Sequence, residues 1–145
     1  MEDKAMAHVD DERRMRLRAI SRYRPAFEDP AAPVGKWFQP EAPAGCISPA
    51  WFALNETAEQ FVAESYAHGW VLAGFDWASW AQTQRAQALR DEPAALASAM
   101  EHELAQLLTV VIRQSRFVEG ALATAFASGL ILHVLNRAEQ IALAG

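Results

Sequence analysis

The chain has 145 residues, the size of one ordinary domain, and 52% of them are apolar, so a single core can be filled. A formal net charge of -5 disfavours general binding to nucleic acid or to anionic membranes, because both depend on clustered positive charge. The single cysteine, Cys46, excludes an intrachain disulfide and a multi-cysteine zinc site, and it makes the cytoplasm the expected compartment.

Charged residues, above all arginines, dominate the first part of the chain. The N-terminus lacks the apolar region of a secretory signal, and residues 1–10 are expected to fray. A helix is expected from a cap at Asp10 or Asp11 to about residues 21–24, before Pro25. Its apolar stripe consists of Met15, Ala19, Ile20, Tyr23 and Phe27. The arginines between them indicate a solvated helix back or a face that docks an acidic protein.

Residues 30–53 combine five prolines with four aromatic side chains. The aromatic residues argue against a solvated linker, because such linkers are poor in large apolar groups. We therefore expect an irregular arm packed on the helices. A short strand pair near 34–38 and 45–48 is compatible with this arm.

The next helix is expected over residues 56–68. Either a capping box from Thr57 to Gln60 or the side chain of Asn55 would cap its first turn. Gly69 suits the left-handed residue that follows a helix end.

A third helix is expected from Asp76, as its N-cap, to about Arg90. Phe75 and Trp80 occupy the two positions of a hydrophobic staple around this cap. Trp77 remains unexplained by the cap; it is either part of an aromatic ligand platform or, more simply, a core or interface residue.

Two further helical stretches are expected at 94–117, with Pro93 at the first helical position, and at 121–143, with a joint at Ser128-Gly129. The face of the first is apolar at Leu104, Leu107, Leu108, Val111 and Ile112. Between Leu130 and Leu143 the second is apolar over more than one stripe, which favours a homodimer or partner interface there.

These patterns predict an all-α fold: a single domain over residues 1–145 with five to six helices and the arm at 30–53. No apolar run approaches the roughly 20 residues of a membrane span.

One polar group on the 94–117 helix is a candidate site. His102, Thr109, Arg113 and Arg116 project to its flank and back, and Glu119 follows three residues after Arg116. Three interpretations stay open: an anion or carboxylate site made by the arginines, a buried Arg–Glu contact that orients the joint at Gly120, or a solvated helix back.

Motifs of catalysis and cofactor binding are missing from the sequence. The histidines have no metal-ligand spacing, and no nucleotide-binding or serine-hydrolase motif occurs. Cys46 has no histidine beside it and is interpreted as a small packed residue. We therefore expect no metal and no cofactor.

Two segments carry a family resemblance. One contains Gly69, Trp70, Phe75, Asp76, Trp77 and Trp80; the other contains Leu107, Leu108, Thr109, Arg113, Arg116, Phe117, Glu119, Gly120 and Leu122. Over about residues 17–141 the chain resembles a bacterial domain family of unknown function. The resemblance implies an all-α fold with a small irregular or β arm. It implies no activity, but Thr109, Arg113, Arg116 and Glu119 fall within its signature.

Two functions are compatible with these observations. The first is a non-enzymatic interaction or regulatory protein, such as a small bacterial or phage inhibitor that docks to a partner. The second is an anion-binding module or enzyme that holds a phosphate or carboxylate through Arg113 and Arg116. A concave pocket around these arginines would favour the second.

Overall fold

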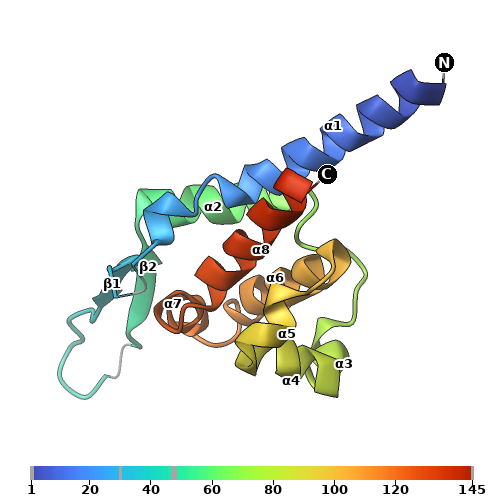
Figure 1. The fold of residues 1–145 in the computed structure, drawn as a ribbon. Coiled ribbons are helices and arrows are strands. Elements are labelled where there is room, and N and C mark those ends of the chain that lie inside the picture. The colour runs from blue at the N-terminus through green and yellow to red at the C-terminus, as the bar shows by residue number, and fades with distance from the viewer. Residues whose placement is uncertain (1, 30, 47–48, 145) are drawn as a thin grey trace.

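The computed structural model of the chain describes residues 2–29, 31–46 and 49–144, and its described part is mainly helical (Figure 1). The helices are α1 (Glu2–Ser21), α2 (Glu56–Ala67), α3 (Trp77–Ala81), α4 (Gln84–Asp91), α5 (Pro93–Ala97), α6 (Glu101–Gln114), α7 (Ala121–Ala127) and α8 (Leu130–Ala144). A 3-10 turn, η1, spans Pro25–Phe27, and two strands, β1 (Gly35–Phe38) and β2 (Trp51–Leu54), form an antiparallel hairpin. The all-α prediction is confirmed.

The described chain has eight α-helices where five to six were predicted, because two predicted helices are interrupted. The helix expected over 76–90 stops after Ala81, and the Thr83 side chain accepts a hydrogen bond from the Ala86 N–H to start α4. The helix expected over 94–117 divides at residues 98–100. The predicted joint at Gly129 is present, with φ of 84°.

Helix caps agree with the sequence in most places. Asn55, and not the Thr57–Gln60 capping box, caps α2 by accepting from the Ala58 N–H. Asp76 caps α3, and the rings of Phe75 and Trp80 lie 5.9 Å apart as a staple requires. The start of α1 was predicted wrongly: the helix begins at Glu2 and not at a cap near Asp10.

The core is built around α8, which packs against α1, α5, α6 and α7. An aromatic cluster at one end joins α1, η1, α2 and α7, with ring centroids 4.7–6.2 Å apart; it consists of Tyr23, Phe27, Phe61 and Phe126. The predicted apolar stripe of α1 is correct except for Met15, which is 66% exposed, while Leu17 is buried. These four neighbours bury much of the apolar surface of α8, whereas Leu143 is 73% exposed; an interface with a second chain on this helix stays a prediction.

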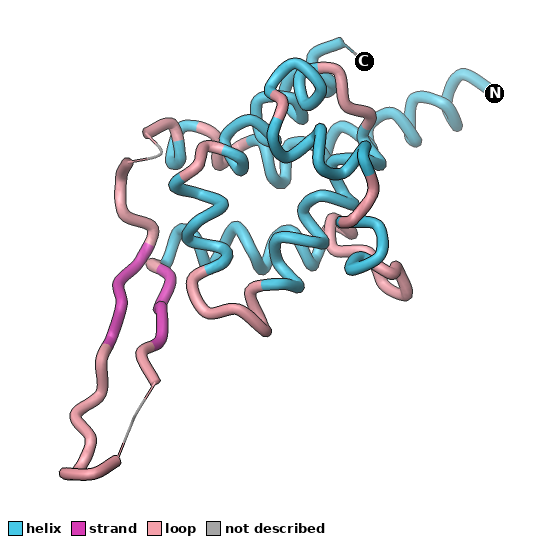
Figure 2. Tube along the Cα trace, turned by 90° about the horizontal axis from the view of Figure 1, so that it is seen from below, coloured by secondary structure: helices cyan, strands magenta, loops and turns pink. Residues whose placement is uncertain are grey.

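The hairpin extends away from the helices (Figure 2). Its first strand lies where the sequence predicted one, but its second is at 51–54 and not at 45–48, of which 47 and 48 lie outside the described residues. Register explains the shift: Gly35 is paired with Leu54, and the Asn55 N–H donates to the Val34 carbonyl at 2.7 Å. The arm is thus less packed than predicted, and Cys46 is exposed.

Across the described residues, no single helix is long and apolar enough to cross a membrane. Only α7 and α8 taken together reach that length and composition, and they are bent by 65° at Gly129.

Candidate functional site

The segment 113–120, between α6 and α7, gathers side chains from three other parts of the chain. Helix α6 ends at Gln114, and the chain turns until Gly120, whose φ of 82° begins α7. This left-handed conformation favours glycine. The segment thereby forms an exposed corner.

Two arginines of this corner share one aromatic ring. The guanidinium carbons of Arg113 and Arg116 lie 5.9 and 5.7 Å from the centre of the Tyr66 ring. Arg116 also donates to the Tyr66 hydroxyl at 2.8 Å. Neither arginine has a carboxylate partner within the described chain. Two positive charges are therefore held side by side without an acid to neutralise them.

The predicted Arg116–Glu119 contact is not formed. Glu119 turns the other way and accepts a hydrogen bond from the Phe52 N–H of β2 at 2.6 Å. Both Arg116 and Glu119 are exposed, so the interpretation as a buried ion pair is wrong. Glu119 instead attaches the hairpin to the corner.

A second hairpin contact lies beside the first. A Cβ atom added to Gly120 would be 2.5 Å from the Trp37 ring, so Trp37 lies directly against the glycine backbone. Trp37 also contacts the Phe52 ring, with centroids 5.5 Å apart, and is 55% exposed.

Apolar side chains continue the surface on the far side of the corner. Trp77 of α3 is half-buried and stacks on Phe117, with centroids 6.2 Å apart, while Phe117 itself is 78% exposed. Trp77 and Val118 line a mainly apolar groove of about 580 Å³ between α3, α4, α6 and α7, whose lining also includes Arg90 and Asp91 of α4. We call Tyr66, Trp77, Arg113, Arg116 and Phe117 the outer arginine surface.

Thr109 does not belong to this surface, contrary to the prediction. It is fully buried, its hydroxyl lies 2.7 Å from the Ala105 carbonyl and 3.3 Å from the Trp70 carbonyl, and it accepts from the Leu72 N–H at 2.9 Å. Residues 70–72 cover this flank of α6, so a position predicted to lie on the polar flank and back of the helix is in the core. His102 of the same predicted stripe is exposed and lies away from Arg113.

A second arginine cluster was missed by the sequence interpretation. The Glu101 carboxylate accepts from Arg13 Nε at 2.6 Å and from Arg16 Nη1 at 2.8 Å. Arg16 also donates to the carbonyls of His68 and Gly69 and lies 4.0 Å over the Trp70 ring. These residues, which we call the inner arginine cluster, join α1 to the end of α2 and the start of α6. No local signal could reveal it, because its members are far apart in sequence.

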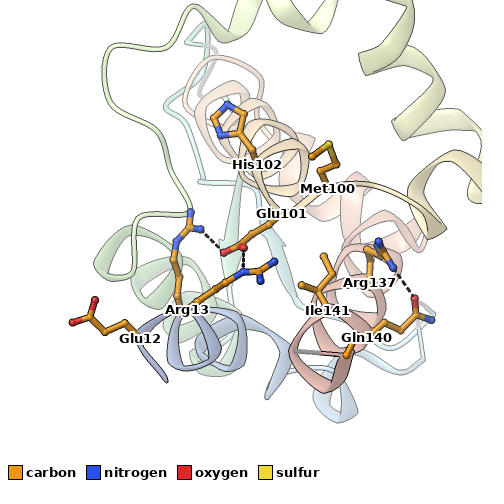
Figure 3. A pocket seen from close by; sticks show the side chains of 10 residues that line it. Glu12, Arg13, Met100, Glu101, His102, Arg137, Gln140 and Ile141 are labelled. Atoms are coloured by element: carbon orange, nitrogen blue, oxygen red, sulfur yellow. Dashed lines mark hydrogen bonds and ion pairs between the residues drawn. The ribbon is translucent and has the colours of Figure 1, made fainter. Parts of the chain in front are cut away.

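The inner cluster borders a cavity of about 980 Å³ between α1, α6 and α8. Figure 3 shows Arg13 directed at Glu101, with Arg137 and Gln140 on the opposite wall. Arg137 donates to the Ala99 carbonyl at 2.8 Å. The charges of this cavity are thus largely occupied by contacts within the chain, which makes it a weak candidate for a ligand site.

Most other arginines of the described chain also have internal acids. Seven form ion pairs with carboxylates of the chain itself: Arg13, Arg14, Arg16, Arg22, Arg24, Arg85 and Arg90. The described His, Cys, Asp and Glu side chains include no group of three placed to hold a metal ion. Arg113 and Arg116 are thus two described arginines without an acidic partner that lie beside the same aromatic ring.

Comparison with known proteins identifies the family. A model of a family of unknown function, DUF6508, matches residues 12–143. The chain belongs to this family. Neither the curated proteins nor the solved structures include a significant match. Within this DUF6508 chain, the residues that carry the sequence resemblance separate into core positions such as Trp70 and Thr109, the half-buried positions Trp77 and Arg113, and the exposed position Arg116.

Proposed function

We propose that this DUF6508 protein is a non-enzymatic docking module that binds a partner protein through the outer arginine surface. The observation that carries the proposal is the exposed Phe117 beside two arginines that have no internal acid. Exposed apolar groups next to arginine are typical of the centres of protein interfaces. An exposed free thiol fits a reducing compartment, and we include the cytoplasm in the proposal.

Charge complementarity defines the partner. Arg113 and Arg116 favour carboxylates, which a planar guanidinium binds in a two-point geometry. The adjacent groove, rimmed by Trp77 and Val118, favours an apolar side chain. We therefore infer a partner segment that carries Asp or Glu next to aromatic or large aliphatic residues.

A small-molecule site is less well supported. The cavities bordered by Arg13, Phe27, Trp77 and Gly35 do not include Arg113 or Arg116 in their lining. Small ligands are usually bound in concave pockets that bury most of their surface, whereas Arg116 is exposed at this corner and Arg113 is half-exposed. This geometry favours docking over phosphate or carboxylate chemistry.

A displayed library of random linear peptides, selected on the purified protein, tests the proposal. We expect enriched peptides to combine an acidic residue with an aromatic or large aliphatic residue. Fluorescence anisotropy should show binding weakened at least about tenfold by the double substitution Arg113→Gln/Arg116→Gln and by Phe117→Ser.

Arg18→Gln is the matched control for Arg116→Gln. Arg18 is also exposed and has no carboxylate partner among the described residues, so Arg18→Gln removes the same charge from α1, outside the outer arginine surface. The affinity of Arg18→Gln for the peptides should stay within about twofold of wild type, since an exposed charge that does not contact the peptide is largely screened by salt. Equal binding by the double variant, or failure to enrich any acidic peptide, would overturn the proposal. If the protein self-associates and Phe117→Ser abolishes this association, the occupant of the surface is a second copy of the chain and not another protein.

A further inference from the structure

We propose that the outer edge of β1 binds an extended strand of a protein partner, which joins the hairpin as a third strand. This edge shares no residue with the outer arginine surface and acts through main-chain groups. The inference therefore goes beyond the docking surface and can fail or succeed independently of it.

The register of the hairpin defines which main-chain groups point outward. The Asn55 N–H donates to the Val34 carbonyl, so the main chain of Val34 faces β2. Alternation along the strand then directs the main-chain groups of Lys36 and Phe38 towards β2 and those of Gly35 and Trp37 away from it. The same alternation directs the Phe52 N–H away from β1, where it meets Glu119.

The two edges of the hairpin differ in what covers them. On β2, the Glu119 carboxylate occupies the outward Phe52 N–H, so a further strand is blocked there. On β1, the outward groups of Gly35 and Trp37 have no hydrogen-bond partner in the described chain. Figure 2 shows β1 as the strand farther from the helices, with no described element on its outer side. Natural proteins usually cover or charge such edges, because an open edge binds another strand.

The chemistry beside the edge identifies the strand that would bind. An apolar hollow of about 340 Å³ lies on one face of the hairpin and is lined by Lys36, Phe38 and Ala53, among others. Gly35 also lines it, and a Cβ atom added there would be 2.1 Å from the Ala53 carbonyl oxygen, so the close approach of the two strands needs glycine at this position. Lys36 is exposed and forms no ion pair within the described residues. Strand residues two apart share a face, so the partner strand should carry an apolar residue for the hollow and an acid two positions away for Lys36.

Peptide selection on the Arg113→Gln/Arg116→Gln variant isolates this edge, because its binders cannot use the arginine pair. We expect enriched peptides with an acidic and an apolar residue two positions apart. Lys36→Gln should weaken these peptides, whereas Arg18→Gln should leave their affinity unchanged.

Trp37→Pro and Trp37→Ala form a matched pair. Both remove the indole ring, but only proline removes the outward N–H, and it leaves the bonds to β2 intact. We expect Trp37→Pro to bind the peptide at least about tenfold more weakly than Trp37→Ala does. The reason is that proline removes a main-chain hydrogen bond to the peptide and disturbs the fit of the added strand.

Amide hydrogen exchange can be measured on the wild-type protein, so misfolding of a variant cannot affect the result. In the free protein, the amides of Gly35 and Trp37 should exchange faster than those of Lys36 and Phe38; bound peptide should protect the Trp37 amide. Unchanged exchange at Trp37 on binding, or equal affinity of the proline and alanine variants, would overturn the proposal. A dimer that protects Trp37 without peptide would also overturn it, because a second copy would then be the occupant.

Discussion

The inner arginine cluster and the outer arginine surface contain similar residues but differ in whether their arginines bind a carboxylate of the chain. Each contains two arginines and an aromatic ring: Arg16, which shares Glu101 with Arg13, lies over Trp70, and both Arg113 and Arg116 lie beside Tyr66. The inner cluster includes its own acid, Glu101, which binds both guanidinium groups.

The outer surface has no such acid, because Glu119 bonds to the hairpin main chain. Two neighbouring arginines therefore do not by themselves indicate a candidate binding site. What distinguishes the two regions is whether a carboxylate of the chain binds the arginines. Substitutions in the inner cluster should change stability, and those in the outer surface should change binding.

The largest expected effect is at Arg16. Arg16→Ala removes the bond to Glu101, two bonds to the carbonyls that end α2, and the contact with Trp70. We expect a loss of about 3 kcal/mol in the free energy of unfolding, measured by urea denaturation. Arg116→Ala should cost less than about 1 kcal/mol, because its single partner, Tyr66, is exposed. Equal losses for the two variants would remove the distinction between the regions.

Thr109 is a core residue, although the sequence interpretation grouped it with Arg113 and Arg116 of the outer arginine surface. Thr109→Val keeps the shape but leaves the Leu72 N–H without its acceptor, which should cost about 2 kcal/mol. Thr124→Val is the control, since its exposed hydroxyl bonds only to the Gly120 carbonyl and its loss should cost less than about 0.5 kcal/mol. Peptide binding by Thr109→Val well below its melting temperature should equal that of wild type.

Gly120 connects the outer surface to the hairpin. Gly120→Ala places a methyl group on a left-handed residue and against the Trp37 ring, which should cost about 2 kcal/mol in thermal unfolding. Gly74→Ala separates the two causes, because Gly74 has φ of 67° and nothing within 4 Å of an added Cβ. A smaller loss in the free energy of unfolding for Gly74→Ala, near 1 kcal/mol, would assign the additional loss at Gly120 to the contact with Trp37. Identical losses would show that the hairpin contact contributes nothing.

The smallest effect is expected at Asp76, which caps the short helix that carries Trp77. Hydrogen bonds from the hydroxyl and then from the N–H of Ser79 hold the pKa of Asp76 below its usual range. Because the folded pKa is depressed, the stabilisation is present above the unfolded pKa and is lost as pH falls through the folded one. The melting temperature of Asp76→Ala should therefore approach that of wild type below about pH 4. A difference that persisted at low pH would exclude the charged cap as its cause.

Local features were predictable from the sequence, and long-range ones were not. Asp76, Phe75 and Trp80 are neighbours in the chain, so their cap and staple could be read directly. Arg16 could not be assigned, because its partners are 52 to 85 residues away.

The errors have the same origin. A helical projection places Thr109 on a flank but does not show that residues 70–72 cover it. The second strand was misplaced because its position depends on pairing between Val34 and Asn55. In the candidate site, Arg113, Arg116 and Trp77 remain predicted binding residues, whereas the contact of Glu119 could not be predicted because its partner on the hairpin is 67 residues away.

The docking proposal requires that a partner supplies the carboxylate that Arg116 lacks within the chain. A double-mutant cycle between Arg116 and each acidic residue of a selected peptide tests this requirement most directly. Affinities of wild type and Arg116→Gln would be measured by titration calorimetry for the peptide and its Glu→Gln or Asp→Asn forms. We expect a coupling energy of about 1.5 kcal/mol or more for at least one acid, and none for the same cycle at Arg18. Coupling below about 0.5 kcal/mol for every acid would contradict it, because Arg116 would then remain without a carboxylate even in the complex.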